Sequence, residues 1–368
     1  MKRTPVALVT GFLGSGKTTL INRLLGHPGM ADTAVIVNEF GEIGLDHHLI
    51  ATSDDAVVLL ENGCLCCAVR GDLVRTLDDL HRKRSGGTLP QFARVLIETS
   101  GLADPGPVIQ ALLGEPTLHA RYALGGVIAV VDAVNGPATL DARIEALKQV
   151  AVADRIVLTK LDLAGAASAP LADAAALRER LATINPGAAI VPAPAAPDPA
   201  FFFDARTPED ADDPAAVVNW LAAERYLGDA VRSRDPTRPR HDARVRSCCI
   251  VRDEPVSEAV LGLFIDALSS SLGPALLRLK GLIAVAERPD TPAVLHGAQA
   301  LLHELRWLPR WPSADRRTRI VVITLDRDPR DIEALLDLAE RMAAGAKRAR
   351  ARSPAPGARL PANACLSS

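Results

Sequence analysis

The sequence predicts an α/β fold in which a doubly wound, mostly parallel sheet is followed by a smaller α+β domain. Three observations support this prediction. A glycine-rich loop lies between a strand-like and a helix-like segment near the N-terminus, apolar runs alternate with helical patterns up to about residue 160, and the composition changes after Val191. The chain has 368 residues, of which 48% are hydrophobic. This is enough apolar sequence for two domains, each with its own core.

The glycine-rich loop fits the pattern G-x-x-x-x-G-K-[ST], which wraps phosphate groups with backbone N–H groups. A short apolar run, Val6–Val9, precedes it, and apolar residues at helical spacing follow it, so a helix N-terminus would face the phosphates. In this pattern the lysine reaches the outer phosphates and the hydroxyl residue after it holds Mg²⁺. The sequence therefore predicts a nucleotide-binding loop made of Gly11, Gly14, Ser15, Gly16, Lys17, Thr18 and Thr19.

Five further apolar runs would complete the sheet. They are Val35–Val37, Val57–Leu60, Arg94–Glu98, Gly125–Asp132 and Asp154–Thr159. Helical spacing is found between them, from Val69 to Leu80 and from Leu140 to Val150. Strands that alternate with helices in this way predict a parallel sheet with its ligand at the carboxyl ends of the strands.

An acidic residue, Glu98, ends the third of these runs. In P-loop enzymes an acid at this place holds Mg²⁺, usually through water, and a glycine a few residues further on contacts the γ-phosphate. Glu98 and Gly101 fit these two roles. The alternative is an ordinary acid at the end of a strand, exposed to solvent.

The segment Thr159-Lys160-Leu161-Asp162 ends the last of the apolar runs. A carboxylate such as Asp162 can accept hydrogen bonds from N1–H and the 2-amino group of guanine, and adenine offers neither. A site built on such a pair rejects the base that lacks it. We therefore expect Thr159, Lys160 and Asp162 to bind the base, and guanine is favoured over adenine.

Three cysteines, Cys64, Cys66 and Cys67, fall within four residues. Thiolates bind zinc and other metals that tolerate soft ligands, so this cluster could supply most of a tetrahedral site. On an extended backbone, Cys64 and Cys66 would point to one face and Cys67 inward. A further ligand would come from the acidic loop before the cluster, with Glu42 first, Glu39 next, and His47 or His48 as other options. Buried structural cysteines or a redox pair are the alternatives.

The C-terminal half is divided by composition. A first domain over residues 1–191 would be followed by a connector rich in Pro and Asp over residues 192–243, largely extended, with one short helix near Trp220. Alternating strands and helices then indicate a small α+β domain over residues 244–346. Arginines among Pro, Ala and Gly predict a disordered basic tail over residues 347–368.

Composition argues against several classes of partner. The net charge is −2 and aromatic residues make up 3% of the chain, so neither a nucleic acid nor a membrane surface is expected as a partner. No run reaches the roughly 18 apolar residues of a membrane span. The basic start Met1-Lys2-Arg3 is similar to a signal peptide, but Lys17 interrupts the apolar stretch that follows. We expect a cytoplasmic protein that is not exported.

The order and spacing of these motifs resemble the CobW family of metallochaperone GTPases. The motifs are G-F-L-G-S-G-K-T-T, N-E-F-G-E-I-G-L-D, N-G-C-L-C-C, E-T-S-G-L-A-D-P and T-K-L-D. The second domain is also similar to that family's C-terminal domain, through Leu277–Gly281, His296-Gly297 and the segment from Trp307. The resemblance covers nearly the whole chain except the connector and the tail.

The resemblance implies a GTPase that binds GTP, GDP and Mg²⁺, carries Zn²⁺ or Co²⁺, and transfers the metal to a client protein. It places the metal on Cys64, Cys66 and Cys67, with Glu42 and Glu39 as further candidates, and we expect Asp46 to orient the attacking water. Two departures stand out. Thr159 replaces the asparagine of the common N-K-x-D motif, and Val37 stands where some relatives have a glutamate.

Two other functions fit the sequence. One is an ATP-dependent kinase or ATPase with buried cysteines, and the other is a redox or structural interaction protein whose P-loop binds nucleotide but hydrolyses it slowly. The residues do not choose the metal or the client, and they leave open whether the chain forms a homodimer.

Overall fold

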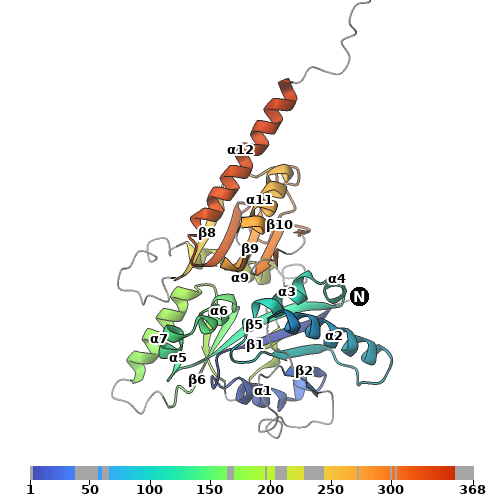
Figure 1. Ribbon diagram of the computed structural model, residues 1–368, viewed down its shortest axis with the longest axis vertical. Coiled ribbons are helices and arrows are strands. Elements are labelled where there is room, and N and C mark those ends of the chain that lie inside the picture. The colour runs from blue at the N-terminus through green and yellow to red at the C-terminus, as the bar shows by residue number, and fades with distance from the viewer. Residues whose placement is uncertain are drawn as a thin grey trace, which may run out of the picture.

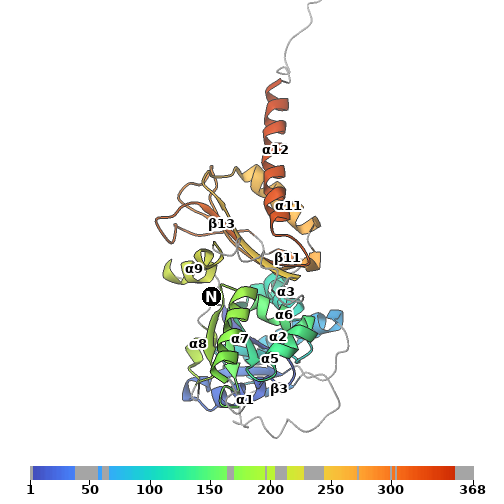
Figure 2. The same cartoon turned by 90° about the vertical axis from the view of Figure 1, so that its left-hand side faces the viewer.

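The structure is a computed structural model that describes residues 3–37, 57–59, 66–163, 170–194, 197–203, 214–227, 244–271, 273–298, 301–302 and 305–352. These residues form two stacked parts (Figure 1). The first part is an α/β sheet with its helices, and the second is an antiparallel sheet from which one long helix projects (Figure 2).

The first sheet has seven strands among the described residues, in the order β3-β2-β4-β1-β5-β6-β7. Every neighbouring pair is parallel. The strands are β1 (Thr4–Thr10), β2 (Thr33–Val37), β3 (Val57–Leu59), β4 (Arg94–Glu98), β5 (Tyr122–Asp132), β6 (Arg155–Thr159) and β7 (Ala189–Pro192). The parallel α/β sheet is therefore confirmed, and β7 is a strand that the composition did not predict.

Helices cover both faces of this sheet. One face packs against α1 (Lys17–Leu25), the short η1 (Pro28–Met30) and α8 (Pro199–Phe203). The other face is covered by α2 (Cys66–Ser85), α3 (Gly106–Gly114), α4 (Pro116–His119), α5 (Gly136–Ala142), α6 (Ile144–Val152) and α7 (Pro170–Ile184). Burial on both faces explains why the strands are almost continuously apolar.

The second sheet is antiparallel, in the order β11-β10-β9-β13-β8, with β12 paired to β10. Its strands are β8 (Val245–Arg252), β9 (Leu276–Ile283), β10 (Ala293–Ala298), β11 (Leu301–Leu302), β12 (Arg306–Trp307) and β13 (Thr318–Leu325). The short η6 (Gly273–Ala275) precedes β9.

Side chains alternate between the two faces of this second sheet. Ile320 and Val322 of β13 pack with α11 (Glu258–Ser271) and α12 (Arg330–Arg352). Val321 and Ile323 join the core of the first part. One face of the sheet thus serves as the contact with the α/β domain.

The connector is more structured than its composition predicts. Phe202 and Phe203 of α8 are buried against the first sheet. Further on, α9 (Pro214–Leu221) and η4 (Ala223–Tyr226) bury Trp220 and Tyr226 between the two parts. The short helix predicted near Trp220 is present, as α9 followed by η4. The prediction of an extended chain is wrong at α8, because its aromatic side chains have apolar surface to bury.

The predicted disordered tail also begins too early. Helix α12 is continuous to Arg352, so residues 347–352 are helical. The remaining residues of the predicted tail, 353–368, lie outside the described part of the chain.

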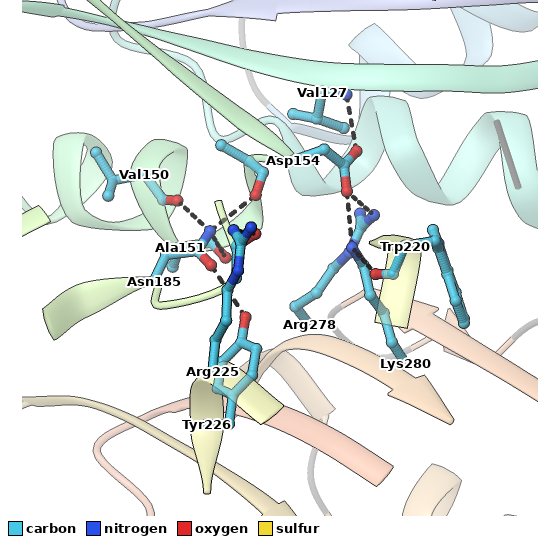
Figure 3. A network of polar contacts seen from close by, with 12 residues as sticks. Val127, Val150, Ala151, Asp154, Asn185, Trp220, Arg225, Tyr226, Arg278 and Lys280 are labelled. Carbon is cyan, nitrogen blue, oxygen red and sulfur yellow. Dashed lines mark hydrogen bonds and ion pairs between the residues drawn. The ribbon is translucent and has the colours of Figure 1, made fainter. Parts of the chain in front are cut away.

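A buried group of charges joins the two parts, as Figure 3 shows. Asp154, just before β6, accepts hydrogen bonds from Lys280 Nζ (2.8 Å) and Arg278 Nη2 (3.1 Å), both on β9. Its second oxygen accepts from the backbone N–H of Val127 (2.9 Å). Lys280 Nζ also donates to the carbonyl oxygen of Trp220 (2.9 Å). The cations of the second domain are therefore held by one carboxylate of the first.

A second set of contacts lies beside this group (Figure 3). Asn185 Nδ2 donates to the carbonyl oxygens of Val150, Ala151 and Ala153, at 2.9, 3.2 and 2.8 Å. The Tyr226 hydroxyl donates to Asn185 Oδ1 (3.1 Å). Asn185 precedes β7 as Asp154 precedes β6, so both contacts lie at the amino ends of the strands.

Candidate functional site

The glycine-rich loop connects β1 to α1, as the sequence predicts. Gly14 and Gly16 have positive φ values of 70° and 94°, a region that side chains with a Cβ rarely adopt. A Cβ at Gly11 would lie 2.3 Å from the carbonyl oxygen of Val130. Glycines at these positions allow the loop to keep this shape. The loop leads from the carboxyl end of β1 to the N-terminus of α1.

Lys17 begins α1 and is only 7% exposed. Its Nζ donates to the carbonyl oxygens of Gly11 (2.9 Å) and Phe12 (3.2 Å). The ammonium group is therefore held in place by the backbone of the phosphate-binding loop. The first turn of α1 carries no acidic side chain, so the positive end of the helix is available to an anion.

Thr18 and Glu98 are brought together by the neighbouring strands β1 and β4. The Thr18 hydroxyl donates to Glu98 Oε1 at 3.0 Å, and Glu98 is only 5% exposed. A hydroxyl and a carboxylate are oxygen ligands of the kind that Mg²⁺ prefers, next to a phosphate-binding loop. The donor set therefore fits a magnesium ion.

The loop after Glu98 packs closely on the phosphate-binding loop. A Cβ at Gly101 would lie 2.6 Å from the backbone nitrogen of Leu13, so only glycine allows this approach. The loop of Gly101 therefore lies directly against the phosphate-binding loop, and its contact with the outer phosphate stays a prediction.

Helix α6 holds that loop from the other side. Gln149, which is 1% exposed, donates from Nε2 to the carbonyl oxygens of Gly101 and Ala103, each at 3.1 Å. Lys148 Nζ pairs with Asp104 Oδ2 at 2.7 Å. Sequence reasoning missed these two residues, because nothing local in the sequence marks a glutamine that caps the carbonyls of a distant loop.

The Thr159-Lys160 pair also contacts the phosphate-binding loop. The Thr159 hydroxyl donates to the carbonyl oxygen of Ser15 (2.6 Å), and Lys160 Nζ donates to that of Gly14 (2.8 Å). Lys160 Nζ also pairs with Asp132 Oδ2 at 2.7 Å. Asp162 is exposed in the turn after β6. The structure thus brings the predicted base-binding segment to the predicted phosphate-binding loop.

Much of the predicted metal site lies outside the described residues. This holds for Cys64, Glu39 and Glu42, and for Asp46, the predicted water-orienting residue. Cys66 and Cys67 form the start of α2, and nothing is described of their side chains. The backbone at these two cysteines is helical, so the predicted extended alternation does not apply to them.

The strand ends nevertheless indicate where the segments predicted to bind metal leave the sheet. Val37 of β2 pairs with Leu59 of β3 and with Glu98 of β4, so these three strands end side by side. The segments that carry the acidic loop and the cysteine motif follow Val37 and Leu59 directly. Both segments therefore start from the edge that holds Glu98 and the phosphate-binding loop.

The cysteines of the second domain are of another kind. Cys248 and Cys249 lie next to each other in β8 and pack on opposite faces of the sheet. Burial raises the pKa of Cys248 to about 12 and that of Cys249 to about 11. Both stay protonated at neutral pH, which suits core packing rather than metal binding.

The described residues contain no group of three or more His, Cys, Asp and Glu side chains arranged to hold a metal ion. Within the same residues, no helix combines the length and the apolar character that crossing a membrane requires.

Two family models match the chain. Residues 5–192 match the model described as "CobW/HypB/UreG, nucleotide-binding domain". Residues 245–340 match "Cobalamin synthesis protein cobW C-terminal domain". The first match covers the parallel sheet and its phosphate-binding loop, and the second covers the antiparallel sheet.

Known proteins resemble the chain over nearly its whole length. It is 32% identical over 335 residues to the zinc chaperone YjiA of Escherichia coli (strain K12), covering 91% of this chain and 98% of that protein. A crystal structure of Zn(II)-bound YjiA GTPase from E. coli matches with a TM-score of 0.66 and 29% identity, covering 92% of this chain and 99% of the other.

A shorter match is to zinc-regulated GTPase metalloprotein activator 1 of Schizosaccharomyces pombe. It is 33% identical over 166 residues, 43% of this chain and 39% of that protein. Together with the two family models, these similarities show that the chain belongs to the CobW/HypB/UreG family.

Proposed function

We propose that this protein is a GTPase that binds zinc through Cys64, Cys66 and Cys67 and transfers it to a client metalloprotein. The similarity to YjiA, a zinc chaperone and GTPase by name, supports the choice of GTP and zinc. The contacts of Thr159 with Ser15 and of Lys160 with Gly14 carry the guanine part of the proposal. They fasten the segment that ends at Asp162 to the loop that would hold the phosphates.

The contacts of the described residues support a role for each of them, and the role of Asp46 rests on the sequence alone. The N-terminus of α1 and Lys17 bind the phosphates, and Lys17 is already oriented by two loop carbonyls. Thr18 and Glu98 would hold Mg²⁺, which supplies positive charge to the phosphate oxygens when bound. Gly101 allows its loop to approach, Gln149 fixes that loop, and we assign water orientation to Asp46.

The zinc part follows from the chemistry of the cysteines. Zinc binds both thiolates and carboxylates, so three thiolates with one carboxylate, from Glu42 or Glu39, would fill the four positions of a tetrahedral site. Thiolate ligands need a reducing compartment, in agreement with the cytoplasmic location expected from the sequence. A homodimer stays a prediction, which a molar-mass measurement with and without nucleotide would decide.

The nucleotide part is tested by competition. A fluorescent guanine nucleotide is bound to the protein with Mg²⁺ and displaced by GDP or ADP, and phosphate release from GTP is followed separately. We expect GDP to compete at least about 100-fold better than ADP, since a site that pairs with base hydrogens rejects a base lacking them. Equal competition by ADP would contradict a guanine site, and no phosphate release with zinc and client present would contradict a GTPase.

The zinc part is tested by stoichiometry. Reduced protein is titrated with zinc against a competing chelator, for the wild type and a variant with Cys64→Ser, Cys66→Ser and Cys67→Ser. The matched control is Cys248→Ser, a partly buried thiol outside the motif. We expect one tight zinc per chain in the wild type and the control, and none in the triple variant. Tight zinc in the triple variant would rule out these cysteines as the site.

A further inference from the structure

We propose that Asp132 is a positioning residue for guanine-nucleotide binding, whose carboxylate holds Lys160 against the phosphate-binding loop. This inference rests on the proposed function, because it assigns the base to the segment from Thr159 to Asp162. Sequence reasoning gave Asp132 no role beyond ending a strand.

The geometry places Asp132 beside the base-binding segment. Asp132 ends β5 and pairs in register with Thr159, the last residue of β6. Its Oδ2 lies 2.7 Å from Lys160 Nζ, which donates to the carbonyl oxygen of Gly14 at 2.8 Å. The lysine ammonium is therefore bound at once by a carboxylate from β5 and by the phosphate-binding loop.

The carboxylate is itself rigidly held. Its Oδ1 accepts from the backbone N–H groups of Val134 (2.8 Å) and Asn135 (3.2 Å), and its Oδ2 accepts from Asn135 Nδ2 (2.9 Å). The side chain is only 8% exposed. Burial alone would raise the pKa of Asp132, but the hydrogen bonds from Lys160, Asn135 and Val134 outweigh it and lower the pKa. The acid stays charged at neutral pH.

Lys160 needs such an anchor. Its backbone has a φ of 55°, in the left-handed region, and its side chain is 34% exposed. A long, partly exposed side chain loses conformational entropy when it is fixed, and a strong interaction such as an ion pair is needed to offset this cost. The turn in which Leu163 N–H donates to the Lys160 carbonyl oxygen (3.1 Å) carries Asp162. Fixing Lys160 therefore fixes the segment that would read the base.

Asp132 also accounts for the departure at Thr159. The hydroxyl of Thr159 is used to bind Ser15 (2.6 Å). The longer side chain of the asparagine found in N-K-x-D is absent here, so the charge pair between Asp132 and Lys160 is a second tie between the base segment and the phosphate loop. Charge-assisted hydrogen bonds are the stronger kind.

The test is a double-mutant cycle on nucleotide affinity. GDP and inosine diphosphate, which lacks the 2-amino group, are titrated against the wild type, Asp132→Asn, Lys160→Met and the double variant. The matched control is Asp141→Asn, an acid paired with Arg180 at the surface. Asn keeps the shape of Asp132 but loses its charge and replaces one acceptor oxygen with an NH2 donor. We therefore expect Asp132→Asn to weaken GDP binding about tenfold and to reduce the preference for GDP over inosine diphosphate.

In the Lys160→Met background, Asp132→Asn should have almost no further effect, since it acts through the lysine. If the two losses multiply instead, or if Asp132→Asn binds GDP as the wild type does, the inference is wrong. Should Asp132→Asn fail to fold, Asn135→Ala removes one bond to the carboxylate and should weaken GDP binding in the same direction, and an unchanged affinity there would overturn the inference.

This outcome is separable from that of the proposed function. A wild-type protein that binds GDP no better than ADP would overturn both. A wild type that is selective for guanine, with multiplicative losses in the cycle, would overturn the role of Asp132 alone.

Discussion

Asp132 and Asp154 are two buried carboxylates that each hold a lysine, at opposite edges of the same sheet. Asp132 ends β5, at the carboxyl edge, and its partner Lys160 is 34% exposed. Asp154 precedes β6, at the amino edge, and its partners Lys280 and Arg278 are 13% and 4% exposed. The first pair belongs to loops that would bind a ligand, and the second joins two domains.

The two charge pairs differ in exposure because the two ends of the strands serve different purposes, ligand binding at the carboxyl ends and domain contact at the amino ends. Ligand sites of parallel α/β sheets lie at the carboxyl ends of the strands, so a charge there must stay within reach of the ligand. The charges at the amino edge are largely shielded from water, so each one needs its partners to offset the cost of desolvation. Burial alone would raise the pKa of Asp154, but Lys280 and Arg278 lower it well below its usual range.

One helix touches both regions. Gln149 of α6 holds the loop of Gly101, while the carbonyl oxygen of Val150, the next residue, accepts from Asn185 at the amino edge. The helix also packs against β9 of the second domain. A change in the loop at Gly101 thus has a short path to the domain contact. Substitutions at the amino edge should therefore mainly change stability, and substitutions at the carboxyl edge should mainly change nucleotide chemistry.

Asp154→Ala should have the largest effect on stability. It leaves Arg278 and Lys280 buried without a counter-charge, and removing one partner of a buried ion pair costs about 3–5 kcal/mol. Thermal unfolding or urea denaturation measures this loss. The matched control is Arg244→Ala, which removes an exposed pair with Asp326 and should cost less than about 1 kcal/mol. Equal losses in the two variants would contradict the special place of Asp154.

Thr18→Ala should have the largest effect on catalysis with little effect on stability. It removes a hydroxyl that donates to Glu98 and would hold Mg²⁺. Loss of a metal contact to phosphate costs several kcal/mol of transition-state stabilisation, and we expect at least a roughly 100-fold slower GTP hydrolysis. The variant is compared with the wild type over a range of Mg²⁺ concentrations. A rate unchanged at every concentration would exclude Thr18 from the magnesium site.

Gln149→Ala should have an intermediate effect on catalysis. It leaves the carbonyl oxygens of Gly101 and Ala103 without their donor, which costs about 1–3 kcal/mol. We expect GTP hydrolysis to slow about tenfold, with GDP affinity nearly unchanged, because the loop of Gly101 would contact only the outer phosphate. A loss in GDP affinity as large as the loss in rate would show that Gln149 supports the whole site instead.

Tyr226→Phe should have the smallest effect. It removes the hydroxyl that donates to Asn185 Oδ1 while the ring stays buried, so the cost is about 1 kcal/mol. Unfolding should report this loss, and GTP hydrolysis at a temperature well below the transition should not change. A large loss of hydrolysis would mean that the domain contact controls the nucleotide site directly.

The sequence predicted the parts of the site that lie within one local motif. Thr18 and Lys17 belong to a recognised loop, and Glu98 ends an evident strand. Asp132 and Gln149 could not be predicted, because only the register of β5 with β6 and the packing of α6 bring them to their partners. Such contacts depend on the folded arrangement of residues far apart in the chain.

Errors in the prediction have a similar origin. The prolines and aspartates of the connector predict an extended chain, but Phe202 and Phe203 in α8 are buried against the sheet. The helical start of α2 at Cys66 was missed because the cysteine spacing was considered on an extended backbone. Composition describes solvation well, but it does not reveal a surface on which aromatic side chains can be buried.

We expect nucleotide and zinc to change each other's binding, because the segments predicted to hold zinc follow strand ends that lie beside Glu98 and the phosphate-binding loop. The most direct measurement is the zinc affinity of reduced protein without nucleotide, with GDP, and with a slowly hydrolysed GTP analogue. We expect the GTP analogue to change the zinc affinity by at least about fivefold relative to GDP. Zinc should then change the affinity for the analogue, relative to GDP, by the same factor. A zinc affinity that is the same in all three states would contradict it.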